Sequence, residues 1–173
     1  MSATVSSKVD APYFPVARHK LIVMSLTTLS LYQLYWFYRN YQRIGSGSVF
    51  WRAVAAPLTA RGLFAHVRAD AQSRFVAVSW SSAGLAAIYL ALSLICFFEY
   101  PWWTLALASV LALVPVHATM EAINRTVAPH GERNDAYSVA DAVIIVLGVA
   151  LTIVALYLTR REREFVQQLM NEL

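Results

Sequence analysis

Residues 75–120 have the sequence FVAVSWSSAGLAAIYLALSLICFFEYPWWTLALASVLALVPVHATM, in which Glu99 is the only Asp, Glu, Lys or Arg. The hydrocarbon core of a bilayer, about 30 Å thick, is crossed by about 20 apolar residues in a helix. The stretch is long enough for two crossings, which we place at about residues 75–98 and 101–120, joined by a turn at Glu99 and Tyr100. Because lipid offers the backbone no hydrogen-bond partner, each crossing is predicted to be helical.

Two further stretches have the same character. Residues 21–38 are apolar between Lys20 and Arg39, and residues 142–159 are apolar between Asp141 and Arg160. Ser138, three residues before Asp141, resembles the first residue of a capping box at the start of the last helix. The sequence therefore predicts an all-α, polytopic membrane protein whose four transmembrane helices form a small bundle.

The remaining residues divide into two tails and one connecting segment. Residues 49–70 are predicted to form short interfacial helices between the first two spans, interrupted at Pro57. In this arrangement the side chains that dip into the interface are Trp51, Leu58, Leu63 and Phe64. A re-entrant segment is the alternative. Residues 1–14 are predicted to be a flexible tail and residues 160–173 a polar C-terminal tail, on either side of one transmembrane domain at 15–159.

The composition excludes several classes of protein. Hydrophobic residues make up 58% of the chain and charged residues 14%, whereas soluble domains average about 45–50% and about 25%. A disordered chain, a nucleic-acid-binding domain and an ordinary soluble enzyme are therefore excluded, and no nucleic-acid partner is expected. The sequence contains no phosphate-binding loop, dinucleotide fingerprint or hydrolase motif, so we predict no cofactor and favour a non-enzymatic role.

The distribution of Lys and Arg predicts an orientation in the membrane. The turn at Glu99 and Tyr100 has no Lys or Arg, whereas the first long loop has Arg39, Arg43, Arg52, Arg61, Arg68 and Arg74. The third loop adds Arg125 and Arg133. Basic loops remain in the cytoplasm, so both of these loops are predicted to be cytoplasmic and the turn external.

Polar side chains gather at the end of the third predicted span. His117, Glu121 and Asn124 share one face of the helix, and Arg125 lies one turn beyond Glu121. A histidine and a carboxylate one turn apart can both bind a metal ion, if neighbouring segments supply further ligands such as His66, His130 or Asp141. The alternative is a helix that leaves the membrane, in which Glu121 and Arg125 form an ordinary ion pair.

A second set of candidates lies in the basic first loop. Its arginines, together with an aromatic side chain, are suited to contact anionic lipid headgroups or a membrane-protein partner. The candidate contact residues are Arg39, Arg52, Arg61, Arg68 and Trp51.

Residues 14–40, FPVARHKLIVMSLTTLSLYQLYWFYRN, resemble the first helix of an uncharacterised family of small bacterial inner-membrane proteins. In that family an arginine-bearing loop similar to residues 51–53 and 61–65 follows, and the third helix ends in an Asn-containing stretch similar to residues 121–125. Family members often have glycine where Ser30 stands here. The resemblance implies a multi-pass protein of the bacterial inner membrane and no particular activity.

Three functions remain open from the sequence. The first is a non-enzymatic structural protein that contacts lipid or serves as partner in a complex. The second is a component of a transporter or channel, which would have to be a homo-oligomer because four short spans enclose little volume. The third is a membrane metal-binding protein or enzyme that uses His117 and Glu121.

Overall fold

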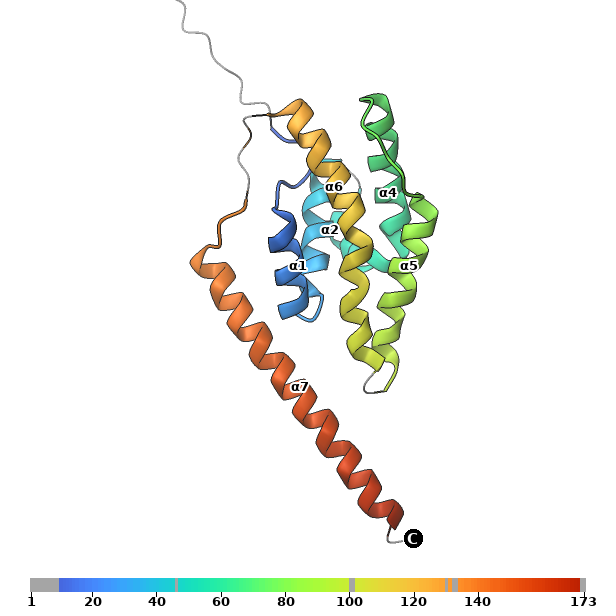
Figure 1. Cartoon of the computed structure of the whole chain (residues 1–173), viewed down its shortest axis with the longest axis vertical. Helices are drawn as coiled ribbons and strands as arrows, with labels where there is room; N and C mark the ends of the chain where they lie inside the picture. The colour runs from blue at the N-terminus through green and yellow to red at the C-terminus, as the bar shows by residue number, and fades with distance from the viewer. Residues whose placement is uncertain (1–9, 46, 100–101, 130, 132–133, 172–173) are drawn as a thin grey trace, which may run out of the picture.

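The computed structural model of the chain describes residues 10–45, 47–99, 102–129, 131 and 134–171. Every regular element in these ranges is helical, which confirms the all-α prediction. The elements are α1 (Arg18–Thr27), α2 (Leu31–Arg43), α3 (Val49–Val54), α4 (Ala56–Ser73), α5 (Ser82–Leu94), η1 (Ile95–Phe97), η2 (Trp102–Ala108), α6 (Ser109–Val127) and α7 (Val139–Asn171). Helices α1, α2, α4, α5 and α6 form a bundle, and α7 runs along one side of it and extends beyond it (Figure 1).

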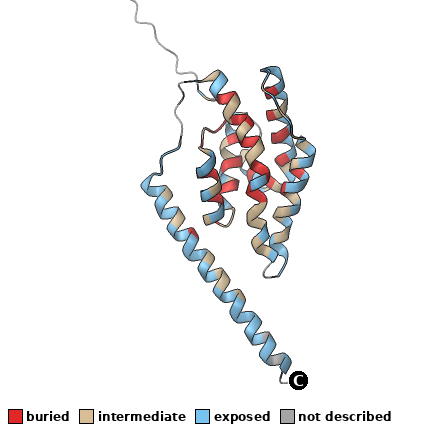
Figure 2. Ribbon diagram, viewed as in Figure 1, coloured by how far each residue is buried: buried red, intermediate tan, exposed pale blue. Residues whose placement is uncertain are grey.

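The bundle core lies between α2, α4 and α6, where the buried residues gather (Figure 2). Aromatic side chains fill much of it: the ring of Phe37 lies 6.3 Å from that of Phe64 and 5.5 Å from that of Tyr89. Aromatic pairs at such separations add to the stabilisation from their buried area. A hydrogen bond of 3.1 Å from Gln33 Nε2 to Ser109 Oγ joins α2 to α6 within this core.

The prediction of one span over residues 21–38 is wrong, because the chain reverses there to form a helical hairpin. Helix α1 has 10 residues and α2 has 13, so at 1.5 Å per residue they are about 15 Å and 20 Å long. Neither reaches across a bilayer alone. Helix α1 ends at Thr27. Leu29, two residues later, has a φ of 50°, and Ser30 N–H donates to the Ser25 carbonyl at 2.8 Å. This is the Schellman pattern that terminates many helices.

Thr28 stabilises both sides of the reversal. Its hydroxyl donates to the Met24 carbonyl at 2.7 Å and accepts from the Tyr32 N–H at 3.0 Å. The threonine therefore satisfies a carbonyl near the end of α1 and a backbone donor at the start of α2. Ser30 follows it with a φ of 69°, which is also in the left-handed region.

The left-handed conformation of Ser30 leads to a prediction for Ser30→Gly. Left-handed backbone costs an L-residue roughly 1 kcal/mol that glycine does not lose. We expect the variant to be more stable by about 0.5–1 kcal/mol, measured by unfolding in a detergent titration. Glycine would adopt this conformation without strain.

Ser93→Gly is the matched control, because Ser93 has helical backbone in the last turn of α5, which continues into η1. There the same substitution should destabilise the protein by about 0.5 kcal/mol. Equal effects at both positions would contradict the reversal at Ser30.

The prediction that residues 49–70 lie at the membrane interface is corrected by the burial of α4. Leu63, Phe64 and Val67 are fully buried, and α4 packs against α2, α5 and α6. Its buried face also contains Ala56, Ala60 and Ala71, whose small side chains let the neighbouring helices approach closely. Trp51 and Leu58, in contrast, are exposed, at 70% and 75%. Only α3 and the first turn of α4 keep the exposed apolar side chains that an interfacial segment needs.

The second predicted span begins later than residue 75. Helix α4 ends at Ser73. Phe75, two residues later, is in the left-handed region with a φ of 57°, and Val76 N–H donates to the Ala71 carbonyl at 2.9 Å. This repeats the termination seen after α1. Residues 76–79 are not helical, and α5 starts only at Ser82, where the Ser81 hydroxyl accepts from the Gly84 N–H. Helix α5 therefore has 13 residues.

Within the described residues, two helices are long and apolar enough to cross a membrane, at Trp102–Val127 and Val139–Phe165. The first extends the predicted span 101–120 at its carboxyl end, and its predicted first residue, Pro101, lies outside the described residues. The second contains the predicted span 142–159. Helix α7 continues to Asn171, so the polar residues 160–171 prolong it.

The predicted flexible tail is corrected at its carboxyl end. Tyr13 is 1% exposed and Phe14 is 4% exposed, and both belong to the core. Residues 1–9 of that tail lie outside the described residues, as do residues 172 and 173.

Candidate functional site

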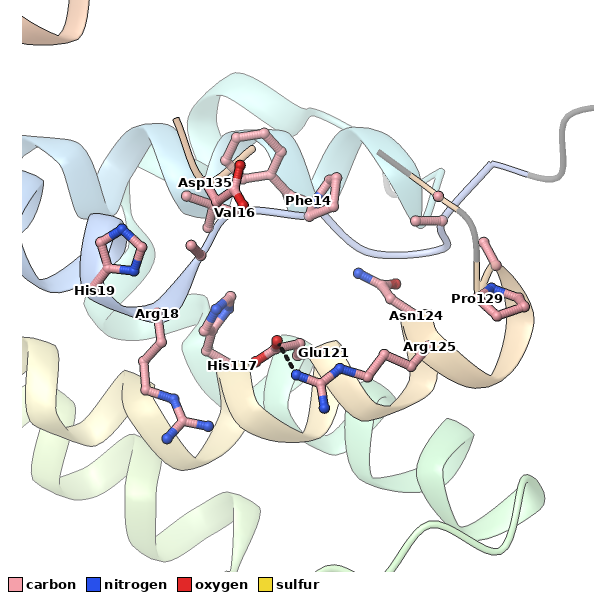
Figure 3. A pocket seen from close by; sticks show the side chains of 15 residues that line it. Phe14, Val16, Arg18, His19, His117, Glu121, Asn124, Arg125, Pro129 and Asp135 are labelled. Carbon is pink, nitrogen blue, oxygen red and sulfur yellow. Dashed lines mark hydrogen bonds and ion pairs between the residues drawn. The ribbon is translucent and has the colours of Figure 1, made fainter. Parts of the chain in front are cut away.

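A cavity of about 520 Å³ lies between residues 11–19, α6 and the segment that follows α6. All four residues of the predicted polar cluster line it: His117, Glu121, Asn124 and Arg125. Figure 3 shows them along one side of α6, opposite the extended segment that leads into α1. The helical spacing read from the sequence therefore places these side chains together.

Asn124 binds the backbone of the N-terminal segment. Its Oδ1 accepts from the Tyr13 N–H at 2.9 Å, and its Nδ2 donates to the Tyr13 carbonyl at 3.1 Å. Asn40 acts in the same way from α2, because its Oδ1 accepts from the Phe14 N–H at 3.0 Å. The two buried amides fix consecutive residues of the segment.

The Tyr13 side chain adds a third attachment. Its hydroxyl donates to Asp70 Oδ2 at 3.0 Å. Burial raises the pKa of this hydroxyl above its ordinary value, and the nearby Asp70 carboxylate raises it further. The hydroxyl therefore stays protonated and able to donate. These contacts give Asn124 a structural role that its helical spacing did not reveal.

We expect Asn124→Ala to destabilise the protein by about 2 kcal/mol, because it leaves the buried Tyr13 N–H without an acceptor. The Tyr13 carbonyl keeps its bond from Arg43 Nη1 at 2.9 Å. Hydrogen exchange of a peptide that contains residues 10–18 should accelerate. Asn171→Ala, at an exposed position of α7, is the control. Unchanged exchange in Asn124→Ala would contradict the proposed role of the amide.

His117 differs from Asn124 because its ring has no hydrogen-bond partner among the described residues. The side chain is 1% exposed, and neither ring nitrogen is hydrogen-bonded in the described part of the chain. The backbone of Val16 lies beside the ring without completing a hydrogen bond to it. The Trp36 ring packs against the imidazole edge at 6.3 Å. A buried polar group without a partner costs free energy, and this cost requires an explanation.

Glu121 and Arg125 form the ion pair that the sequence predicted, with 2.5 Å between Arg125 Nη2 and Glu121 Oε1. Arg125 is mostly exposed, so the pair contributes little to stability.

The described residues contain no group of three or more His, Cys, Asp or Glu side chains that could hold a metal ion. His66 packs against Tyr13 and is not among the residues of the cavity, Asp141 binds Lys20, and His130 lies outside the described residues. Among the described residues, therefore, neither His66 nor Asp141 supplies a further metal ligand to His117 and Glu121.

The chain matches no protein-family model, and no curated protein or solved structure is significantly similar to it.

Sequence reasoning missed the network around Lys20, which was noted only as the boundary of a span. The side chain of Lys20 is 2% exposed. Its ammonium donates to Asp141 Oδ2 at 2.7 Å, to Asn134 Oδ1 at 2.8 Å and to the Ala136 carbonyl at 2.9 Å. All three protons of the ammonium are used. The network joins α1 to the start of α7.

The predicted lipid-contact residues lie outside the cavity. The Arg39 guanidinium stacks on Phe14 at 5.2 Å, and the Arg52 guanidinium on Tyr41 at 4.8 Å. Arg61 is exposed and Arg68 is half-buried. Trp51 packs edge-to-face on Phe50 at 5.2 Å, and both rings are mostly exposed. These residues therefore belong to the outer surface of the bundle.

Proposed function

We propose that the chain is a non-enzymatic, multi-pass protein of the bacterial inner membrane that contacts anionic lipid headgroups through its arginine-rich end. The exposure of α7 is the main observation behind this proposal. In the most apolar 18-residue stretch of its segment Val139–Phe165, only 6% of the residues are buried within the protein. The core helix of a soluble protein would be largely buried, and an exposed apolar surface of this size requires lipid or another protein to cover it.

The proposed arrangement in the bilayer has three crossings and one re-entrant hairpin. Helix α7 crosses alone, η2 and α6 form a second crossing, and α5 with η1 forms a shorter third. Helices α1 and α2 enter from one side and return to it, since each is too short to cross. Val23, Leu26 and Leu31 are exposed on this hairpin and would contact lipid.

The hairpin brings cations of the N-terminal segment to the same end of the bundle as those of the first loop. Arg18 begins α1 and Arg43 ends α2, so the antiparallel helices place these two residues at the same end of the bundle. Two more arginines lie near Tyr13. Arg74 pairs with Asp70, which accepts a hydrogen bond from the Tyr13 hydroxyl. Arg125 follows Asn124 in the chain, and the Asn124 side chain binds the Tyr13 backbone. We call Arg18, Arg39, Arg43, Arg68, Arg74 and Arg125 the basic end. Basic ends face the cytoplasm and its anionic lipids.

A smaller surface supports the same proposal. Phe50, Trp51, Val54 and Leu58 are exposed together on α3 and the first turn of α4. Arg52 and Arg61 flank them. The Arg52 guanidinium reaches the α4 backbone next to Arg61, because a Cβ atom at Gly62 would lie 3.5 Å from Arg52 Nη2. Aromatic and basic side chains in combination are typical of segments at headgroup depth.

Cysteine labelling from outside intact cells tests the arrangement. With Cys96 replaced, single cysteines at Glu99 and Asn171 should be labelled, whereas those at Asp10, Ser48 and Asn134 should be protected. Asp10 separates the two topologies, because four spans would put it outside together with Asn171. Labelling at Asp10 would therefore contradict the re-entrant hairpin.

Lipid selectivity tests the proposed role itself. Protein in nanodiscs that contain phosphatidylglycerol and phosphatidylcholine should retain phosphatidylglycerol preferentially after transfer to detergent. Combined Arg39→Gln and Arg68→Gln, both in the basic end, should remove this preference. Arg160→Gln with Arg161→Gln, on the far part of α7, is the matched control and should retain it. Equal retention of the two lipids by the unmodified protein would refute the lipid-contact role.

A further inference from the structure

The first turn of α1 has unused backbone donors beside the cavity. Its N-cap residue, Ala17, offers no side-chain acceptor. Leu21 N–H donates to the Ala17 carbonyl at 3.0 Å, whereas the N–H groups of Arg18 and His19 have no acceptor in the described part of the chain. Free N–H groups and the helix dipole make such a terminus attractive to an anion. Residues 16–19 line the cavity described above.

His117 provides an independent indication that something binds there. Figure 3 shows its ring projecting from α6 into the cavity, towards the segment that begins α1. The ring is 1% exposed, and both nitrogens lack partners among the described residues. A ligand atom that accepts a hydrogen bond from one ring nitrogen would remove the cost of this unpaired group.

The charges around the cavity restrict the class of ligand. Arg18 forms no ion pair within the described residues and supplies positive charge. Glu121 is already paired with Arg125, so its charge is largely neutralised. Asp135 also lines the cavity and opposes a multiply charged anion. Arg18 and the positive end of the α1 dipole are opposed by Asp135, so the cavity suits a group with no more than one negative charge.

The size and the apolar lining of the cavity indicate what is attached to that group. A volume of about 520 Å³ is far larger than a single carboxylate needs. Phe14, Val16 and Pro129 contribute apolar surface to its wall.

We infer that this cavity binds a small organic carboxylate. The carboxylate lies at the N-terminus of α1 and accepts from its free N–H groups and from His117. The apolar remainder of the molecule contacts the wall formed by Phe14, Val16 and Pro129. The inference does not rest on the lipid-contact role, because its ligand is a soluble molecule. Arg18 and Arg125 belong to the basic end and also line the cavity, so a lipid headgroup is the competing ligand that the experiment must distinguish.

Nuclear magnetic resonance of ring-¹⁵N-labelled histidine tests the inference in a maltoside detergent without phospholipid. The chain has four histidines, and the His117 signals are those that disappear in His117→Phe. Hexanoate should shift them saturably. Acetate should bind at least about tenfold more weakly, because it lacks the apolar remainder. Absence of a saturable shift with hexanoate would overturn the inference.

Two substitutions at Arg18 separate its side chain from its backbone. Arg18→Gln removes the charge and keeps the N–H, whereas Arg18→Pro removes both. Proline suits the first position of a helix, and Ala17, with φ −70° and ψ 144°, already has the conformation that a following proline requires. Hexanoate should bind to Arg18→Pro about fivefold more weakly than to Arg18→Gln. Equal affinities would overturn the placement at the helix N-terminus.

A third arm distinguishes a carboxylate from a lipid phosphodiester. The same spectra are recorded in phosphatidylglycerol nanodiscs without added acid, and hexanoate is then titrated. The inference requires the His117 signals to match those in detergent until hexanoate is added. Signals already shifted by the lipid and unresponsive to hexanoate would assign the cavity to a lipid headgroup and overturn the inference.

Discussion

Replacing Lys20 with methionine is expected to destabilise the protein by about 3 kcal/mol. The substitution removes three hydrogen bonds at once and leaves Asp141 without its cationic partner. Asp141 is partly buried, with a side chain 16% exposed, so water compensates only in part. Unfolding in a sodium dodecyl sulfate titration measures the loss.

A double-mutant cycle with Asp141→Asn isolates the interaction between the two side chains. Asparagine keeps an oxygen that can accept from the Ser138 N–H, as Asp141 Oδ2 does at 2.8 Å. If Lys20 and Asp141 interact directly, the double variant should be more stable than additivity predicts by at least about 1 kcal/mol. Strict additivity would show that the ion pair does not hold α7 to α1.

The local features that the sequence predicted correctly depend on residues close together in the chain. The capping box at α7 is confirmed by the bond from Asp141 N–H to Ser138 Oγ at 3.1 Å. The i,i+4 pair of Glu121 and Arg125 is confirmed as well. The interruption expected at Pro57 lies within two residues of the boundary between α3 and α4. Such features are set by helical geometry alone.

The hairpin at Thr28–Ser30 could not be predicted in the same way. Hydropathy counts apolar residues, and the reversal contains Leu29 between two small hydroxyl residues, so the window over 21–38 remains apolar. The reversal depends on the Thr28 hydroxyl bonding in two directions and on two residues in the left-handed region. Neither Leu29 nor Ser30 prefers that region, so residue type did not indicate it.

Burial of α4 was missed because its buried face is rich in alanine. Ala56, Ala60 and Ala71 add little apolar area to a helical projection, so the periodicity looked weak. Small residues are nevertheless what lets helices approach closely.

For the candidate site, spacing along one helix identified His117 and Glu121, because they share a face. The spacing could not reveal that residues 13–19 pack against the His117 and Glu121 side chains. That contact joins positions about a hundred residues apart, through Asn124 and the bridge between Val16 and Asn134.

Gly148 is a second position, besides Lys20, at which a single substitution should weaken the attachment of α7 to α1. A Cβ atom built there would lie 2.1 Å from the Thr27 carbonyl oxygen and 2.8 Å from its carbon. Both are backbone atoms at the end of α1, so no side-chain rotation can relieve the clash. We expect Gly148→Leu to destabilise the protein by about 3 kcal/mol, with Gly148→Ala intermediate.

The expected displacement can be measured across the groove between α7 and the hairpin. This groove, of about 780 Å³, is lined by Leu31 and Leu151 among others. With Cys96 replaced, cysteines at these two positions should be joined by a short bifunctional maleimide, and Gly148→Leu should abolish the cross-link.

Gly84→Ala is the matched control for the change at Gly148. In α5 a Cβ atom at Gly84 would make only an ordinary contact of 3.5 Å with Ser81, and alanine favours the helix. This variant should keep both the cross-link and the stability.

Lys20 and Gly148 hold α7 to α1 at separate points along α7. If Gly148→Leu loses the cross-link while Lys20 is intact, the ion pair alone does not keep the helix in place. A retained cross-link would instead show that α7 moves to accommodate leucine without leaving α1.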